Sequence, residues 1–457
     1  MKKNVIFFPI ETISRELDYK IILASKLASK DTLCIVGQHD FIDQVAKVSE
    51  NGIYLGKNVF KTTFPCNLDL YNTYKSNNHS IFWLHEEGGI YPGDENIWKK
   101  NLHDLLNPGV LKSDDKIFAW GQFQKQYYEA ENPSIPVILS GSPRFDLAEN
   151  DDLSSLISTF NRVNEDGYIL FNTNFSISNY KSETVEFLKE WISHEKTYEG
   201  KLSVSEQYFI ELRTLSHFLE AILYLASKFK DTKFIVRPHP TEDSAIYKTI
   251  FSELSNVEVS KKFSSVEWIQ KSKLIIQNGC TTSVEAYLLN KPILNYYPFE
   301  DPSNINITEG VGIICKNLSD LENLIVKKLN NPELDTNNKL NKMINNFADG
   351  ASSTDIILNS INEELINKDS FEFNRTIFFL KLRIFILISY IKDKIKFFPR
   401  KYFFRRKWKD YLMAKSAFPG LDCDSIGKKF NYLNKSRYPL KLTFFGKDGF
   451  TIEVKND

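Results

Sequence analysis

Residues 233–240 of the chain read Lys-Phe-Ile-Val-Arg-Pro-His-Pro. The Phe-Ile-Val run favours a β-strand, and each proline pushes the residue before it toward extended backbone. Arg237 and His239 are therefore expected to be extended, and their two-residue spacing points both side chains the same way. The stretch predicts a cation and an imidazole side by side at the carboxyl end of a buried strand, where open α/β sheets bind ligands.

A second strand and a polar loop follow in the same part of the chain. Residues 274–276 are Leu-Ile-Ile, residues 277–283 are Gln-Asn-Gly-Cys-Thr-Thr-Ser, and a helix is predicted from Val284. The N–H groups at the amino end of a helix are a common phosphate site. We therefore predict that Arg237, His239 and this loop bind a diphosphate or a phosphodiester.

The loop also has a purely structural interpretation. Thr282 and Glu285 have the Thr-x-x-Glu spacing of a capping box, which would bond both side chains to the backbone of their own helix. Both interpretations hold if backbone N–H groups bind the ligand, and Glu285 is otherwise a candidate for the ribose hydroxyls. The candidate nucleotide- and phosphate-binding residues are Arg237, His239, Asn278, Gly279, Thr281, Thr282, Ser283 and Glu285.

The first third of the chain alternates strands with helices, which predicts a parallel sheet. Strands are expected at 4–10, 33–36, 80–84, 116–120 and 137–140, with a helix at 14–30. His85, Glu86, Glu87 and two glycines follow the strand at 80–84. A carboxylate there can accept a proton from an attacking sugar hydroxyl, with His85 assisting it. The alternative is a solvated loop that the glycines merely turn.

Further candidates for the substrate cleft come from other strand ends. Arg15 follows the first strand and can meet an acidic substrate, although a helix start capped by Ser14 explains the same residues. The candidate acceptor or substrate residues are Arg15, His85, Gly88, Asn172 and Asn174.

The strand pattern restarts at 167–174 after a polar run. Residues 174–202 are expected to form an irregular polar loop over the cleft, and 205–230 a long helix; further strands are expected at 257–259, 292–297 and 312–314. We predict two Rossmann-like doubly wound domains facing across a cleft, at 1–150 and 165–350.

Residues 370–457 are expected to form a basic amphipathic extension that ends in a small hairpin over 440–454. Residues 375–409 carry twelve Lys/Arg against one acid, Asp393. Lys381 and Arg383 interrupt the apolar run, so it suits a helix lying in the interface of an anionic membrane better than one spanning it. The alternative is a helix packed against the domains. Nothing else in the chain resembles a nucleic-acid module.

Composition bounds the remaining possibilities. The chain is 42% hydrophobic and 25% charged, as in ordinary globular proteins. Its five cysteines are scattered, which argues for a reducing cytoplasm, and the first residues predict a strand and no signal peptide. The D-x-D triplet, Asp422-Cys-Asp424, lies in the extension and follows no strand. We therefore expect no metal site and no cofactor.

Three short motifs resemble those of bacterial sialyltransferases. Glu86-Glu87-Gly88 resembles their acidic motif, Arg237-Pro-His239-Pro240 their His-Pro motif, and Thr281-Thr-Ser283 their Ser/Thr motif. Similar His-Pro elements occur in capsule Kdo transferases and teichoic-acid glycerophosphotransferases. Residues 8–18 also resemble the start of a family of surface carbohydrate biosynthesis proteins, a likeness that extends over most of residues 1–350.

The resemblance implies a GT-B fold, with an acceptor domain at 1–150 and a nucleotide-sugar-binding domain at 165–350, and a metal-independent glycosyltransferase. Glu86 or Glu87 would be the general base, His239 would contact the CMP phosphate, and Thr281, Thr282 and Ser283 would touch it too. We predict transfer of an acidic nonulosonic or Kdo-type sugar from a CMP-sugar to a surface glycan or lipid-linked glycan, by a cytoplasmic enzyme attached peripherally to the inner membrane through 376–409. The alternatives are a CDP-glycerol or CDP-ribitol phosphotransferase, a UDP-sugar enzyme, and a non-catalytic nucleotide-binding scaffold. Retention or inversion stays open.

Overall fold

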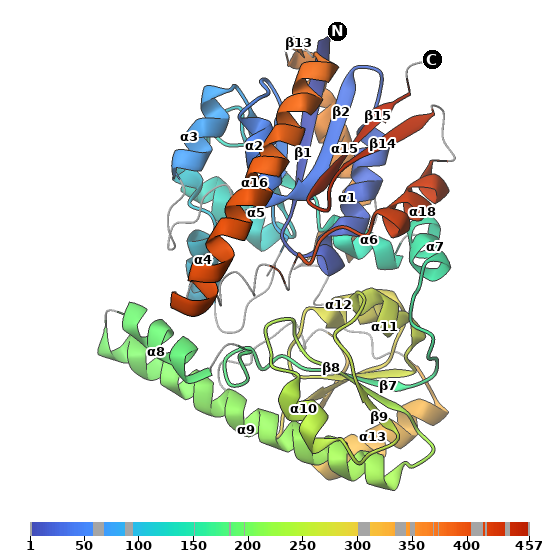
Figure 1. Ribbon diagram of the computed structural model, residues 1–457. Helices are drawn as coiled ribbons and strands as arrows, with labels where there is room; N and C mark the ends of the chain where they lie inside the picture. Colours follow the sequence, from blue (N-terminus) through green and yellow to red (C-terminus); the bar gives the residue numbers. More distant parts are fainter. Residues whose placement is uncertain are drawn as a thin grey trace. The chain divides into compact units, whose positions relative to one another are not determined.

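The chain forms two compact units in a computed structural model. Unit 1 is Met1–Gly89, Glu95–Phe160 and Asn341–Asp457, and unit 2 is Ile90–Asp94 and Asn161–Leu340. Figure 1 labels their helices and strands. The structure describes residues 2–57, 68–86, 95–149, 151–181, 184–195, 197–299, 311–333, 344–347, 352–368, 370–372, 374–403, 415, 418–434 and 439–455.

Unit 1 is built on a sheet whose central strands are parallel. Its strands are β1 (Lys2–Ile10), β2 (Thr32–Gln38), β3 (Ile53–Gly56), β4 (Ser80–Leu84), β5 (Lys116–Ala119), β6 (Val137–Leu139), β13 (Phe371–Glu372), β14 (Leu440–Phe445) and β15 (Gly449–Val454). Their order is β14-β15-β2-β1-β3-β4-β5-β6, with β13 paired to β1. The parallel part has the flavodoxin-like order 2-1-3-4-5, whose switch point lies between β1 and β3.

Helices cover both faces of this sheet, which is why its strands are almost continuously apolar. The helical segments are α1 (Ile13–Leu27), α2 (His39–Ala46), α3 (Leu68–Ser76), α4 (Glu95–Leu105), η1 (Pro108–Val110), α5 (Gln122–Glu131), α6 (Pro143–Glu149), α7 (Asp151–Thr159), η3 (Asn345–Phe347), α15 (Ser353–Asn367), α16 (Arg375–Phe403) and α18 (Cys423–Leu433). α1 packs with α15 and α2 with α16, and Figure 1 shows these pairs on opposite faces.

The carboxyl-terminal part of the chain belongs to unit 1. The predicted hairpin is present as β14 and β15, but it is not a separate extension, because β15 pairs antiparallel with β2 through Phe450↔Val36 and Ile452↔Cys34. Without it, β2 would present an unpaired strand edge to water. Asn346, expected in the second domain, also packs in unit 1, where its amide bonds Ser142 and Asp146.

Unit 2 carries a second parallel sheet. Its strands are β7 (Ile169–Asn172), β8 (Phe234–Arg237), β9 (Val257–Val259), β10 (Leu274–Gln277), β11 (Ile293–Tyr296) and β12 (Ile313–Cys315). Their order, β12-β11-β10-β7-β8-β9, is the 3-2-1-4-5-6 order of a Rossmann fold, with its switch point between β7 and β10. The prediction of two Rossmann-like α/β units is thus confirmed for each unit by itself.

The helices of unit 2 pack on this sheet around a shared apolar core. They are α8 (Thr184–His194), α9 (Tyr198–Lys228), α10 (Ala245–Ile250), α11 (Ser265–Lys271), α12 (Thr282–Leu288) and α13 (Leu318–Asn330). Phe218 and Ile222 of α9 are fully buried against Phe171 and Phe234 of the strands. This core fixes the strand ends that carry the candidate site.

The prediction of an irregular loop at 174–202 is wrong. Most of it is helical, as α8 and the start of α9, because Phe187 and Trp191 recur at helical spacing inside a polar stretch. Tyr180 stacks on Phe187 with the ring centroids 4.1 Å apart. Thr197 caps α9 by accepting the N–H of Gly200 at 3.0 Å. Among the described residues, the chain has no helix of the length and apolarity needed to cross a membrane.

Candidate functional site

The loop after β8 is held in place by a buried carboxylate. Glu242 is fully buried and accepts the backbone N–H of His239 at 2.9 Å, the backbone N–H of Phe175 at 3.1 Å and the Thr173 hydroxyl at 2.8 Å. The Tyr247 hydroxyl also donates to it. This single acid therefore joins the ends of β7 and β8 and sets the backbone direction at His239.

Lysines that the sequence analysis missed surround the same loop. Lys181 and Lys261 donate to the carbonyl of Pro240 at 3.3 and 3.4 Å. Burial, helped by the nearby charges of Lys181 and Arg237 and opposed by the Glu242 carboxylate, lowers the pKa of Lys261 to about 8. Arg237, as predicted, lies at this edge, with Nη2 3.5 Å from the Phe263 carbonyl. The sequence held one signal for Lys261, because this residue comes shortly after β9, the neighbour of β8 in the sheet.

His239 has a defined ring environment. Its Nδ1 lies 2.7 Å from the Thr241 hydroxyl, and the backbone N–H of Thr241 is 3.3 Å from the same nitrogen. Thr241, two residues later, thus orients the His239 ring, while Glu242 fixes the backbone N–H of His239. The structure brings Arg237 and His239 together with two further cations, Lys181 and Lys261, at the carboxyl edge of the sheet.

The switch point between β7 and β10 joins four of the predicted residues. The Asn172 amide donates to the Thr282 hydroxyl at 3.2 Å. The Asn174 N–H donates to the Asn278 side chain at 2.9 Å, and the Asn278 amide donates back to the Asn174 carbonyl at 3.2 Å. Within the described part of the chain, the buried Asn172 Oδ1 has no hydrogen-bond partner. Gly279 turns the chain here with φ +88°, a conformation that glycine adopts without strain.

The predicted capping box at Thr282 and Glu285 is wrong. Thr281 is the N-cap residue of α12, with no side-chain cap bond. Thr282 is bonded to Asn172 instead, and Glu285 accepts the Ser265 hydroxyl at 2.7 Å. Ser283, another candidate, donates to the Cys280 carbonyl at 2.9 Å. Tertiary partners therefore take Thr282 and Glu285 away from local capping, whereas Ser283 bonds within its own turn.

Unit 1 gathers charges at its own switch point. Lys57, just after β3, lies 2.9 Å from Glu11, just after β1, and 3.7 Å from Glu16 of α1. Glu16 also accepts the backbone N–H of Glu11 at 2.9 Å and lies 3.2 Å from Lys20. Helix α1 begins after Thr12, so the predicted Ser14 cap is wrong: the Glu16 carboxylate bonds the N–H groups of the turn instead.

Glu86 completes this charged cluster. It is buried at the end of β4, where the Tyr19 hydroxyl donates to it and Lys20 pairs with it. Its second oxygen, Oε2, has no hydrogen-bond partner in the described part of the chain. Burial first, and then the neighbouring Glu16 carboxylate, raises the pKa of Glu86 to about 7. A carboxyl group that titrates near neutrality suits proton transfer.

Two of the remaining candidates of unit 1, His85 and Arg15, lie within the described residues. His85 Nε2 lies 2.7 Å from the Tyr128 hydroxyl, which explains its orientation without a ligand. Arg15 lies half-buried on α1. Glu87 and Gly88 lie outside the described residues.

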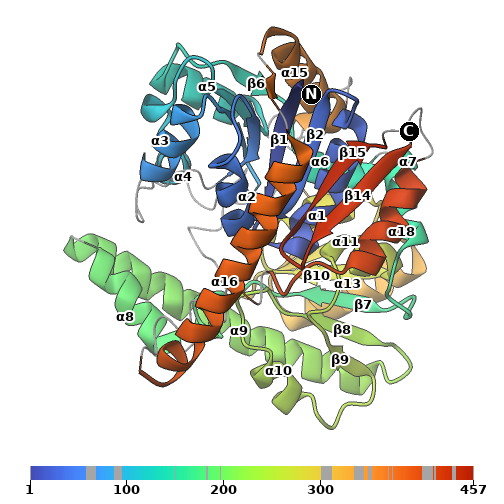
Figure 2. The same ribbon diagram turned by 45° about the horizontal axis from the view of Figure 1, so that its top comes forward.

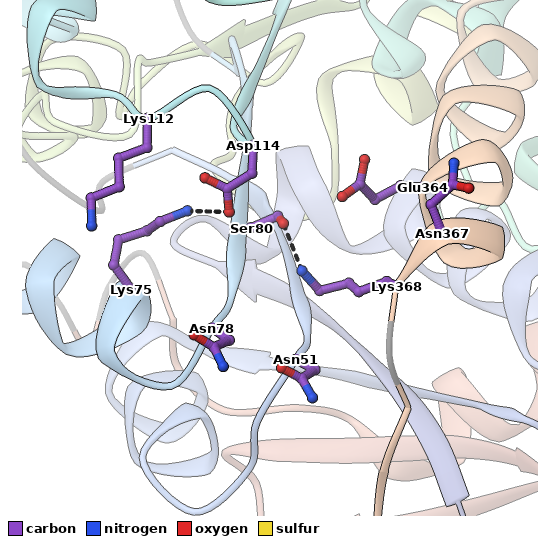
Figure 3. A pocket seen from close by; sticks show the side chains of 9 residues that line it. All are labelled: Asn51, Lys75, Asn78, Ser80, Lys112, Asp114, Glu364, Asn367 and Lys368. Atoms are coloured by element: carbon purple, nitrogen blue, oxygen red, sulfur yellow. Dashed lines mark hydrogen bonds and ion pairs between the residues drawn. The ribbon is translucent and has the colours of Figure 1, made fainter.

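A polar cavity of about 380 Å³ opens on unit 1, away from the predicted residues. Figure 3 shows Lys75 paired with Asp114 and Lys368 bonded to Ser80. The Lys75 Nζ lies 2.7 Å from Asp114 Oδ2, and the Lys368 Nζ donates to the Ser80 hydroxyl at 2.7 Å. Ser80 is the first residue of β4, so the cavity is at the amino ends of the strands. Ligands of such sheets bind at the carboxyl ends, and we do not assign this cavity to the candidate site.

The described residues contain no group of three or more His, Cys, Asp or Glu side chains placed to hold a metal ion.

The chain matches no protein-family model and no curated protein. Solved structures of similar fold include UDP-GlcNAc 2-epimerases in complex with UDP-GlcNAc from Methanocaldococcus jannaschii (14% identity, 79% of this chain and 100% of that one, TM-score 0.43) and Neisseria meningitidis (15%, 79% and 100%, 0.45). The wall teichoic acid polymerase TagF is another (11%, 80% and 89%, 0.47). Likeness at this level assigns neither an activity nor a substrate to this chain.

Proposed function

We propose that the chain is a glycosyltransferase of surface polysaccharide biosynthesis that binds its nucleotide-activated sugar in unit 2. The observation that carries the proposal is the loop after β8, where Arg237, His239, Lys181 and Lys261 gather around a backbone fixed by Glu242. Cations that face an anionic oxygen form hydrogen bonds about twice as strong as neutral ones. A nucleotide phosphate is the ligand that best suits this set.

The leaving phosphate would be stabilised by side chains of the protein. His239 donates a proton or a hydrogen bond to it, and Arg237 with the lysines supplies positive charge. The oxygens of Glu242 are occupied by donors from the loop and from Thr173, so this carboxylate positions the loop and is not a ligand of the phosphate. This division of roles supports a transfer that needs no divalent cation.

The donor we propose is a CMP-activated acidic sugar, such as sialic, legionaminic or pseudaminic acid or Kdo. The support is the order of the acidic, His-Pro and Ser/Thr motifs along the sequence. A UDP-sugar would meet the same cations, and so would CDP-glycerol or CDP-ribitol. The nucleotide is therefore the first property to measure.

Acceptor activation is assigned to the acidic pair after β4. Glu86 has the raised pKa of a proton acceptor near neutral pH, but Tyr19 and Lys20 hold one of its oxygens. Its other oxygen, Oε2, is the atom that would take the proton of a sugar hydroxyl. Glu87, next along the chain, is the second candidate.

The test is metal-free release of CMP from CMP-sialic acid and CMP-Kdo in the presence of glycan acceptors. If the chain is this enzyme, wild type releases CMP from one of the donors, and His239→Ala does not. Glu86→Gln or Glu87→Gln is expected to abolish release while CMP binding is retained. Release from UDP-sugars alone would replace the proposed donor. CMP binding with no turnover of any donor would indicate a scaffold.

A further inference from the structure

Helix α16 is anchored to unit 1 along one face. Phe378, Phe379 and Leu382 are buried, and the Phe379 ring lies 5.3 Å from that of Phe445 in β14. The Arg375 guanidinium bonds Glu453 of β15 at 2.6 Å. Figures 1 and 2 both show the helix lying along unit 1 beside α2. The helix is thus part of the body of unit 1, and its orientation there is fixed.

The opposite face of α16 is an apolar stripe in contact with water. Its residues follow the three- and four-residue spacing of a single helix face. Each is between 43% and 69% exposed, and the set is Ile377, Leu380, Ile384, Leu387, Ile388, Ile391 and Ile395. A continuous apolar surface of this kind marks an interaction site and differs from the single exposed apolar residues common on protein surfaces.

The charges on α16 select the partner. The helix carries eight Lys/Arg and one Asp, and Lys381, Arg383 and Lys394 are exposed. A second copy of the helix packed on the stripe would bring these like charges together. An anionic lipid surface would instead pair with the charges and bury the stripe, as in helices that lie in the membrane interface.

We propose that the outer face of α16 docks unit 1 onto a membrane surface containing anionic lipid, with the helix lying in the plane of the interface. The stripe then enters the boundary between headgroups and acyl chains, and the exposed lysines and arginine reach the lipid phosphates. Because the inner face is packed on unit 1, docking also fixes how that unit is presented to a lipid-linked substrate.

The test is co-sedimentation of the full chain with phosphatidylcholine vesicles, with and without phosphatidylglycerol. Wild type is expected to sediment with the anionic vesicles and less with the neutral ones. Leu380→Gln/Leu387→Gln removes two side chains from the stripe and is expected to weaken binding by about tenfold or more. Lys381→Gln/Arg383→Gln is expected to weaken binding to the anionic vesicles only, and added salt to weaken that of wild type.

A matched control separates docking from a change in fold. Ile366 of α15 is 82% exposed on the same unit, so Ile366→Gln is expected to bind vesicles as wild type does. Unchanged thermal unfolding and CMP binding would show that the variants are intact. The proposal would be overturned if both α16 variants bound vesicles as wild type does, or if wild type did not bind vesicles. If wild type formed a dimer and bound no vesicles, and the stripe variant were a monomer, the outer face of α16 would be assigned to contact with a second copy of the chain.

Discussion

The carboxylate of Glu242 accepts the backbone N–H of His239 at 2.9 Å, three residues earlier in the chain. The same carboxylate also accepts a hydroxyl and a backbone N–H from the segment after β7. A buried acid that satisfies this many donors is structural, and it decides where the His239 ring stands. The candidate phosphate site therefore depends on a residue that would not touch the phosphate.

Replacing Glu242 should destabilise unit 2. Glu242→Ala leaves two backbone N–H groups and two hydroxyls without their acceptor, which we expect to cost about 3 kcal/mol or more in the free energy of unfolding. Urea unfolding measures this. Glu206 is exposed on α9, and Glu206→Ala should change stability by less than about 0.5 kcal/mol. Equal effects of the two substitutions would show that the Glu242 bonds are not needed.

Nucleotide binding should weaken as the pH rises from about 7 to about 9, above the second pKa of phosphate near 6. The pKa of Lys261 is lowered to about 8, so its positive charge is lost across this range and the site becomes less attractive to an anion. Calorimetry of CMP binding at several pH values measures the slope. Lys261→Gln should lower the affinity for CMP and make it less dependent on pH over this range. An unchanged slope in that variant would remove Lys261 from the site.

The pH dependence of stability should report on Glu86. Burial and Glu16 raise its folded-state pKa from 4.5 to about 7, so the folded state binds the extra proton between these values. The contribution of Glu86 to stability is therefore present at low pH and is lost as the pH rises through 7. Glu86→Gln should gain about 1–3 kcal/mol relative to wild type between pH 5 and pH 8. A pH-independent difference would contradict the raised pKa.

The carboxyl-terminal hairpin should contribute to the stability of unit 1. Ile452 is fully buried and pairs with Cys34 of β2. Ile452→Ala should reduce the free energy of unfolding by about 2–5 kcal/mol, because it leaves a cavity in a packed core. Ile366→Ala is the control at an exposed isoleucine and should have little effect. If the hairpin did not contribute to the stability of unit 1, the two substitutions would change the free energy of unfolding by similar amounts.

Two strands were predicted with the bounds that the structure has; one is buried throughout, and the other is partly exposed at the edge of its sheet. The strand at 80–84 is found with those bounds as β4, and that at 257–259 as β9. The loop after β8 also follows from local rules, since the prolines around His239 restrict the backbone wherever it lies. Arg237 and His239 were placed at the carboxyl edge for this reason.

What the sequence did not reveal depends on contacts between distant segments. Lys181 and Lys261 reach one carbonyl, that of Pro240, from different connections of the sheet. Thr282 looked like a local cap but bonds Asn172, 110 residues away. The pairing of β15 with β2 likewise joins the two ends of the chain. No local pattern states which of several competing partners a polar side chain will take.

The most direct test of the phosphate site is calorimetric binding of CMP, CDP and UDP, without metal, to wild type and His239→Ala. The substitution keeps the backbone N–H that Glu242 accepts, so the loop should remain folded. His217→Ala, on the partly exposed His217 of α9, is the matched control. We expect wild type and the control to bind CMP, and we expect His239→Ala to weaken this binding by about tenfold or more. Binding indifferent to His239 would contradict it.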